Sequence, residues 1–255
     1  MQESRWSSRR RNSARRSRSR PSTRGATRPK PRPRWSSSSM SWDPPSGAPS
    51  PDAEAAGEVS GMDLADLVSQ RGAVLLDAVE AHFPGARDHA DATASYAFGA
   101  AVELRFERES AEAIRETARL HEVGMVYVPA AVLSQRPDDR DADGRALIDA
   151  QPAYGAELAR GAGVPARACD WIAASAERFD GQGPAGLAGE RIPLEARIIR
   201  IACACDRTLT APHQSMSAAE HRATAFAWLR VAGGRELDPR VVEALTGMLD
   251  RVTRR

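Results

Sequence analysis

The 255-residue sequence has no stretch that approaches the roughly 20 consecutive apolar residues needed to span a bilayer. This argues against an integral membrane protein and against membrane binding. Its three cysteines, Cys169, Cys203 and Cys205, are too few for a disulfide framework or a paired zinc knuckle. The basic front segment has twin arginines but lacks the apolar region of a secretory signal. We therefore expect a protein of the reducing cytoplasm.

Lysine is nearly absent, and charge is unevenly distributed. Lys30 is the only lysine, against 35 arginines, a bias that fits a GC-rich genome better than selection at each site. Residues 1–60 carry 13 basic and 5 acidic side chains, whereas residues 61–255 carry 23 and 29. The net charge of +2 therefore hides a basic front segment and a mildly acidic remainder.

Residues 1–60 contain fifteen serines, eight prolines and very few branched apolar residues. Such a composition cannot bury enough surface to offset chain entropy, so we predict a disordered tail. Its arginines could bind nucleic acid or another anionic surface electrostatically. Alternatively the tail has no specific partner, or translation starts further downstream, since Met62 stands where the ordered pattern begins. Nucleic-acid binding is expected only through this tail.

From residue 61 onward the pattern is helical, and it predicts an all-α domain over residues 61–255. Apolar residues recur at three-and-four spacing from Leu64 to about His82. Ser217 with Glu220 forms a capping box, and Asp238 before Pro239 marks another helix start. Further helices are expected over residues 87–106, 110–122 (opened by Ser110), 144–162, 165–177, 194–210, 217–232 and 238–252.

Three segments carry the chemistry-bearing residues. They are ARLHEVGMVYVP at 118–129, AERFDGQGPAGLAGERIP at 176–193 and ARIIRIACACD at 196–206. In order and spacing they resemble the HD-GYP subgroup of the HD phosphohydrolase superfamily over residues 85–210. That family has a His-Asp-x-x-Gly-Lys motif, a His-His-Glu…Asp-Gly-x-Gly-Tyr-Pro loop and an Ala-Arg-Ile helix bearing an aspartate. The resemblance implies an HD-domain-like helical bundle, and a homodimer is consistent with it.

The resemblance also implies metal-dependent chemistry. Family members use imidazoles and carboxylates to hold two or three transition-metal ions, which generate a hydroxide that attacks a phosphodiester, usually in cyclic di-GMP. By position, His89 and His121 match two ligand histidines. Glu122 stands where the family has the aspartate of the His-Asp pair, and Cys203 stands where the last segment has its aspartate.

At other positions, residues that the family uses for metal or phosphate binding are replaced in this sequence. The phosphate-binding lysine is replaced by Met125, and the next ligand histidine falls on Gln151. The paired histidines fall on Ser175 and Ala176, and the tyrosine of the loop is missing, so that Gly183 is followed directly by proline.

Two functions follow from these departures. Our main expectation is a catalytically impaired module without a cofactor, which binds a protein partner or a nucleotide in bacterial signalling. The alternative is a weak metal-dependent phosphodiesterase or phosphohydrolase acting on cyclic di-GMP or a related phosphoester. It would hold a single divalent ion (zinc, iron or manganese) with His89, His121, Glu122 and Cys203, a set that suits zinc best. Against it, a buried cysteine is often only a small core residue.

An anion site is a further prediction. Arg197, with the backbone N–H groups of Gly181 and Gly183, could hold a nucleotide phosphate. Alternatively, Arg197 forms an ion pair with Glu177 or Asp180.

Overall fold

The computed structural model describes residues 63–211 and 216–253, which are helical with no strand among them. The helices are α2 (Leu64–His82), α3 (Ala86–Glu103), α4 (Arg108–Arg119), α5 (Ala130–Leu133), α6 (Ala142–Gly161), α7 (Ala166–Ala174), α8 (Leu194–Thr210), α9 (Ala218–Ala232) and α10 (Pro239–Thr253). Short 3-10 turns cover Val123–Tyr127, Pro137–Asp139 and Gly189–Arg191. The predicted all-α fold is confirmed.

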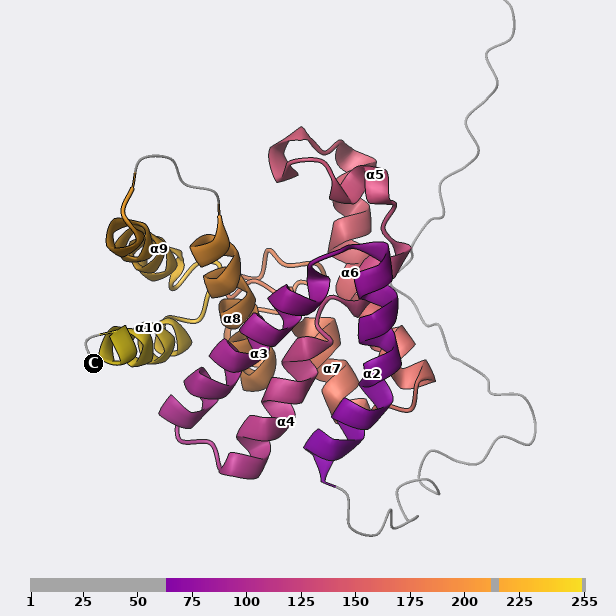
Figure 1. Ribbon diagram of the computed structural model, residues 1–255, viewed down its shortest axis with the longest axis horizontal. Helices are drawn as coiled ribbons and strands as arrows, with labels where there is room; N and C mark the ends of the chain where they lie inside the picture. Colours follow the sequence, from indigo (N-terminus) through magenta and orange to yellow (C-terminus); the bar gives the residue numbers. More distant parts are fainter. Residues whose placement is uncertain (1–62, 212–215, 254–255) are drawn as a thin grey trace, which may run out of the picture. The chain divides into compact units, whose positions relative to one another are not determined.

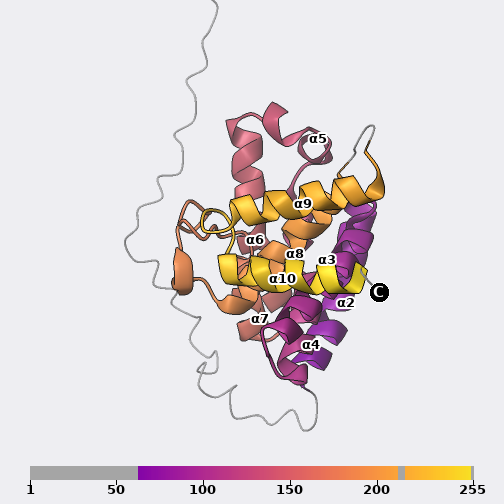
Figure 2. The ribbon, with the colours of Figure 1, turned by 90° about the vertical axis from the view of Figure 1, so that its left-hand side faces the viewer.

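The helices form a bundle around α3, α4 and α8 (Figure 1). Helix α3 packs against both α4 and α8, while α2 packs against α4 and α6 against α7. Helices α9 and α10 run antiparallel to each other, and both contact α8 (Figure 2). The first turn of α3, the end of α4 and the middle of α8 are thereby brought to one place.

Alanine makes this close packing possible. Helix α3 buries Ala94, Ala97, Ala100 and Ala101, each at most 4% exposed, against α4 and α8. Small side chains let helix axes approach closely, so a domain with few aromatic residues can still be tightly packed. The apolar face of α8 contributes its isoleucines and Cys205 to the same core.

Several predicted helix ends are confirmed and others are shifted. Ser217 and Glu220 form both hydrogen bonds of a capping box, and Asp238 caps the helix that begins at Pro239. The helix expected to reach residue 106 ends at Glu103, because Arg105 takes a left-handed conformation with φ 67°.

The following helix begins at Arg108, after an extended Glu107, and not at Ser110 as predicted. It ends at Arg119, so His121 and Glu122 lie in the turn beyond it. Helix α7 is also shorter than predicted and ends at Ala174, and the Ser175 hydroxyl that follows donates to the carbonyl of Ile172. The described helices include none long and apolar enough to cross a membrane.

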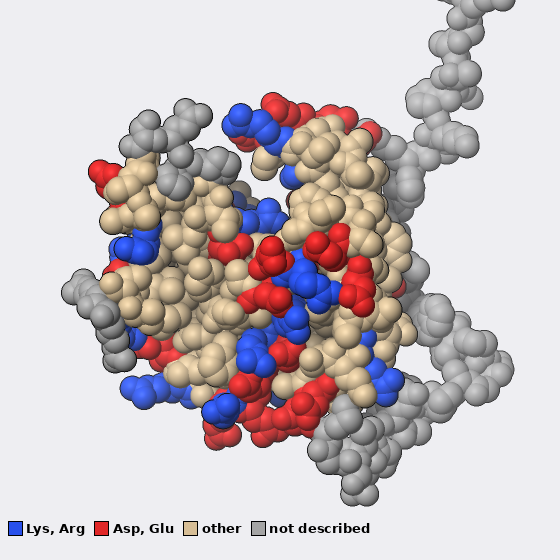
Figure 3. Space-filling view, in the orientation of Figure 1, with Lys and Arg blue, Asp and Glu red and all other residues tan. Residues whose placement is uncertain are grey.

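The charged surface is mixed on the face shown in Figure 3, where acidic and basic side chains lie next to one another. Ion pairs such as Arg87–Asp77 and Arg119–Asp91 contribute little to stability. The mixture of charges leaves the face shown without a uniform positive potential. The predicted disordered tail, residues 1–60, lies outside the described residues.

Candidate metal centre

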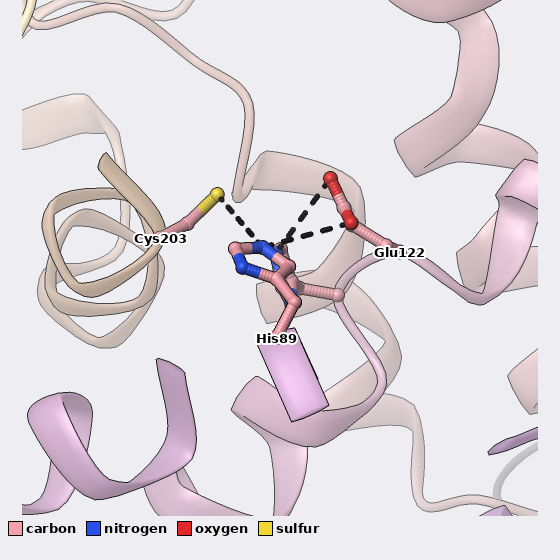
Figure 4. Close-up of side chains that lie close together, drawn as sticks. His89, Glu122 and Cys203 are labelled. Carbon is pink, nitrogen blue, oxygen red and sulfur yellow. Dashed lines mark hydrogen bonds and ion pairs between the residues drawn. The ribbon is translucent and has the colours of Figure 1, made fainter. Parts of the chain in front are cut away.

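Four side chains from three segments meet at one point in the bundle. His89 comes from the first turn of α3, His121 and Glu122 follow α4, and Cys203 lies on α8. One ligand atom from each residue lies within 4.8 Å of the ligand atoms of the other three. Among the described residues, this is the only such group of four. Figure 4 shows the side chains of His89, Glu122 and Cys203 pointing toward one another. The structure thus brings together all four residues that the sequence suggested as metal ligands.

A glycine allows the turn with His121 and Glu122 to pack against α6. A Cβ atom added to Gly124 would lie 2.1 Å from the backbone oxygen of Gln151 on α6, far inside van der Waals contact. The Gln151 side chain also donates from Nε2 to the backbone oxygen of His121 over 2.9 Å. Two interactions with α6 therefore position the turn: the close approach of Gly124 and the hydrogen bond from Gln151.

Both histidines present the same ring nitrogen to the cluster. The Nδ1–H of His89 donates to Oδ2 of Asp206 at 2.6 Å, and that of His121 donates to the backbone oxygen of Ala118 at 2.7 Å. These bonds place the proton on Nδ1 and leave the lone pair of Nε2 free for a ligand. The Nε2 atom of His121 is buried and has no hydrogen-bond partner. An unsatisfied buried polar atom is costly, and a bound metal ion would satisfy it.

The spacing of the ligand atoms, all within 4.8 Å of one another, is close to that around a small tetrahedral ion. His89 Nε2 lies 3.6 Å from Cys203 Sγ and 3.6 Å from Glu122 Oε2, and His121 Nε2 lies 4.0 Å from Glu122 Oε1. Bond lengths of about 2.0–2.3 Å around a tetrahedral zinc ion put its ligand atoms about 3.3–3.8 Å apart. Two imidazoles, one carboxylate and one thiolate are a donor set that zinc accepts readily. The residues present therefore fit a single zinc ion.

The electrostatics keep the carboxylate charged. Burial alone would raise the pKa of Glu122, but the positive charge of Arg207 and the two imidazoles outweigh it and lower this pKa to about 2. Arg207, on α8, also donates a hydrogen bond to Glu122. Burial lowers the pKa of His121, which favours its neutral form. A neutral imidazole and an ionised carboxylate are the forms that bind metal.

The pKa of His89 shifts in the opposite direction from that of His121. Burial acts against protonation, but contact with Cys203 and the negative charge of Glu122 outweigh it and raise the pKa of this imidazole. His89 is thus the member of the cluster whose Nε2 lies 3.6 Å from both Cys203 and Glu122.

Two neighbours of the cluster were not predicted. Asp206 orients His89, and Arg207 neutralises Glu122. They follow Cys203 by three and four residues on a helix and so share its face, which is the signal that could have identified them.

A cavity of about 650 Å³ opens beside the cluster. His121, Glu122 and Cys203 line it. The side chains that replace the family's lysine and its further histidines line the same cavity, namely Met125, Gln151, Ser175 and Ala176. The positions inferred from the resemblance are therefore neighbours in space. Four arginines also line this cavity, namely Arg140, Arg178, Arg200 and Arg207.

The glycine-rich loop after α7 is turned toward a carboxylate of the chain itself. The Glu177 side chain is buried and accepts hydrogen bonds from the backbone N–H groups of Ala185 at 2.5 Å and Leu187 at 3.0 Å. Gly183 lines the cavity, while the N–H of Gly181 donates to the backbone oxygen of Arg178. The N–H groups of Ala185 and Leu187 are thus already occupied by the carboxylate of Glu177.

Arg197 forms a different ion pair from the one expected. Its Nη1 lies 2.5 Å from Oδ2 of Asp238 in a buried pair, and neither Glu177 nor Asp180 is its partner. Asp180 pairs with Arg178 instead, at 2.7 Å. The expected pairing was wrong because α10 begins beside α8, a tertiary contact that the local sequence does not reveal. Phosphate binding by Arg197, Gly181 and Gly183 stays a prediction.

Sequence comparison relates the chain to known proteins. Residues 73–241 match the sequence model of a family described as the HD domain. Over 149 residues the chain is 35% identical to the cyclic di-GMP phosphodiesterase response regulator RpfG of Xanthomonas campestris pv. campestris (strain 8004). The match covers 57% of this chain and 38% of that relative, so the chain spans well under half of the relative's length.

Solved structures share the fold. Bd1817, an HDG"Y"P protein from Bdellovibrio bacteriovorus, superposes with a TM-score of 0.54 at 20% identity, over 73% of this chain and 61% of that one. The HD domain of the L. monocytogenes phosphodiesterase PgpH, in complex with cyclic-di-AMP, gives a TM-score of 0.52 at 15% identity, over 71% and 98%. At these identities the likeness shows a common fold.

Proposed function

Because the chain belongs to the HD-domain family, we propose that it is a phosphodiesterase that works with one divalent metal ion. The observation that carries this proposal is the convergence of His89, His121, Glu122 and Cys203, with the buried Nε2 of His121 left without a partner. The expectation that the chain needs no cofactor finds no support in this arrangement.

The residues of the chain have distinct parts in this proposal. His89, His121, Glu122 and Cys203 would hold the ion, for which zinc is the best match. Asp206 and the backbone oxygen of Ala118 keep the two imidazoles in the orientation that exposes Nε2. When bound, a divalent ion supplies Lewis-acid activation of water and of a phosphoester oxygen.

The substrate class is inferred from the cavity together with the relatives. A volume of about 650 Å³ falls within the range of small-molecule sites, and four arginines favour an anion. RpfG is named for cyclic di-GMP and the PgpH domain was solved with cyclic-di-AMP. We therefore place the substrate among phosphodiesters of the cyclic dinucleotide class.

Hydrolysis assays test the proposal. Purified full-length chain, assayed with cyclic di-GMP, cyclic di-AMP and bis(p-nitrophenyl) phosphate, should lose activity after treatment with a chelator and regain it with one equivalent of zinc. His121→Ala should stay inactive after the same treatment, whereas His82→Ala should respond as the wild type does, because His82 lies outside the cluster and contacts the backbone oxygen of Val128. Activity that is indifferent to chelators, or no activity on any of the three, would contradict the proposal.

A second candidate is the catalytically impaired module that binds a protein partner or a nucleotide. It is favoured by the cavity wall itself, where Met125, Gln151, Ser175 and Ala176 provide no ligand set for a further ion. Two-metal catalysis would lack its second ion at this site. This candidate predicts partner binding that does not change when metal is removed, which pull-down experiments with and without chelator would detect.

A further inference from the structure

Arg200 differs from the other arginines of the cavity in having a buried guanidinium N–H without a hydrogen-bond partner. It lies on α8, one turn before Cys203, and lines the cavity. Its Nη1 donates to the backbone oxygen of Ala176 at 3.1 Å, just past the end of α7. The Nε–H of the same guanidinium is buried without any hydrogen-bond partner, and the described part of the chain offers this group no ion pair.

A buried cation without a counter-ion is unfavourable, because burial removes water from the charge and puts nothing in its place. Burial accordingly lowers the pKa of Arg200 despite the carboxylates nearby. Of these, Glu236 is paired with Arg178, and Glu177 accepts hydrogen bonds from the glycine-rich loop. The charge of Arg200 is therefore left for an anion from outside the chain.

The other three arginines of the cavity already have partners. Arg140 donates to two backbone oxygens, those of Val132 and Gln135. Arg178 pairs with two carboxylates, and Arg207 pairs with Glu122.

The position of Arg200 is also informative. The family resemblance puts paired histidine ligands at Ser175 and Ala176, where this chain has no imidazole. The Arg200 guanidinium reaches the backbone oxygen of Ala176 and lines the same cavity, so a fixed positive charge lies beside the positions of those missing histidines. In two-metal sites the second ion stabilises the oxygens of the phosphoryl group, and a guanidinium can do so with parallel N–H donors.

We propose that Arg200 binds a phosphoryl oxygen of the substrate and supplies the charge that a second metal ion or a lysine at Met125 would otherwise provide. The identification of the anion as a substrate phosphate rests on the proposed function. The binding of an anion at Arg200 does not require turnover, so the two can be tested separately.

Inorganic phosphate is the probe. Calorimetric titration of phosphate into the full-length chain, as purified and after zinc loading, compares wild type with Arg200→Gln, Arg200→Lys and Arg140→Gln. Loss of a charge-assisted hydrogen-bond pair should weaken phosphate binding by about tenfold or more in Arg200→Gln. Arg200→Lys should lose less, because it keeps the charge but not the planar fork. Arg140→Gln removes one charge from the same cavity but should weaken phosphate binding by less than Arg200→Gln does, because the Arg140 guanidinium already donates to two backbone oxygens.

Circular dichroism melting of each variant shows whether it folds. If Arg200→Gln does not fold, the Lys variant carries the test, with weaker phosphate binding than wild type as the supporting result. Wild-type affinity in the folded Arg200 variants, equal losses in Arg140→Gln, or no phosphate binding by the wild type would each overturn the proposal. Zinc content of the same samples tests the proposed function independently: a zinc-free wild type whose phosphate binding still depends on Arg200 would contradict the metal site and support the anion site.

Discussion

The Nδ1–H of His89 donates to Asp206 across 2.6 Å, and Asp206 shares a face of α8 with Cys203. A carboxylate in this position orients the imidazole and raises its basicity toward a metal ion. Asp206 is thus a positioning residue that acts through His89 and touches no substrate itself.

Removing that carboxylate should weaken the metal site without dismantling the fold. Asp206→Ala should lower zinc affinity by about 10- to 100-fold, as loss of such outer partners does elsewhere. Competition with a chromophoric chelator measures this affinity. Asp149→Ala is the matched control, because Asp149 also lines the cavity but lies outside the cluster. Equal zinc affinities for the two variants would show that Asp206 has no such role.

The four suggested ligands could be predicted because a family motif fixes their positions along the chain. The roles of Arg200, Asp206 and Arg207 could not, although the first two stand within the third segment, because these roles depend on which way α8 faces after packing. The same limit explains Arg197, whose partner Asp238 is brought near only by the contact between α8 and α10.

At the scale of elements, the turn after α4 depends on its close approach to α6.

Most helix positions follow from apolar spacing and capping residues. The shifted ends are those set by backbone conformation, such as the left-handed Arg105, for which the residue type gives no signal. Helix α5 was not among the expected helices, because four residues are too few for periodicity to identify one.

Gly124→Ala should therefore displace this turn. The added Cβ would lie 2.1 Å from the Gln151 backbone oxygen, and overpacking of this kind lowers the free energy of unfolding by about 1–3 kcal/mol. Zinc retention should fall as well, because His121 and Glu122 move with the turn. Urea unfolding and zinc content measure the two effects.

Gly161→Ala supplies the control for this prediction. A Cβ there meets nothing within 4 Å, so the change should be neutral or stabilising by up to about 1 kcal/mol. If Gly124→Ala were as stable and as rich in zinc as Gly161→Ala, the close approach to α6 would not be what positions the turn.

At the scale of the whole molecule, residues 1–60 carry a net positive charge, and the rest of the chain is mildly acidic. The sequence alone predicts that these two parts act separately. Any nucleic-acid binding should then come from the front segment, and metal binding from the bundle.

Deleting residues 1–60 tests that separation. Filter binding with a DNA duplex should show affinity for the full chain that falls steeply as salt rises, and loss of that affinity in the truncated chain, because phosphate contacts release counterions. Zinc content per chain should be the same in both. Salt-dependent DNA binding that persists after the deletion would assign it to the bundle instead.

The proposed function requires a single metal ion held by His89, His121, Glu122 and Cys203. The most direct measurement is elemental mass spectrometry of the full-length chain, purified without a chelator or a histidine tag. We predict one equivalent of zinc per chain, lost in His121→Ala and retained in His82→Ala. No stoichiometric metal in the wild type, or metal retained in full by His121→Ala, would contradict the account.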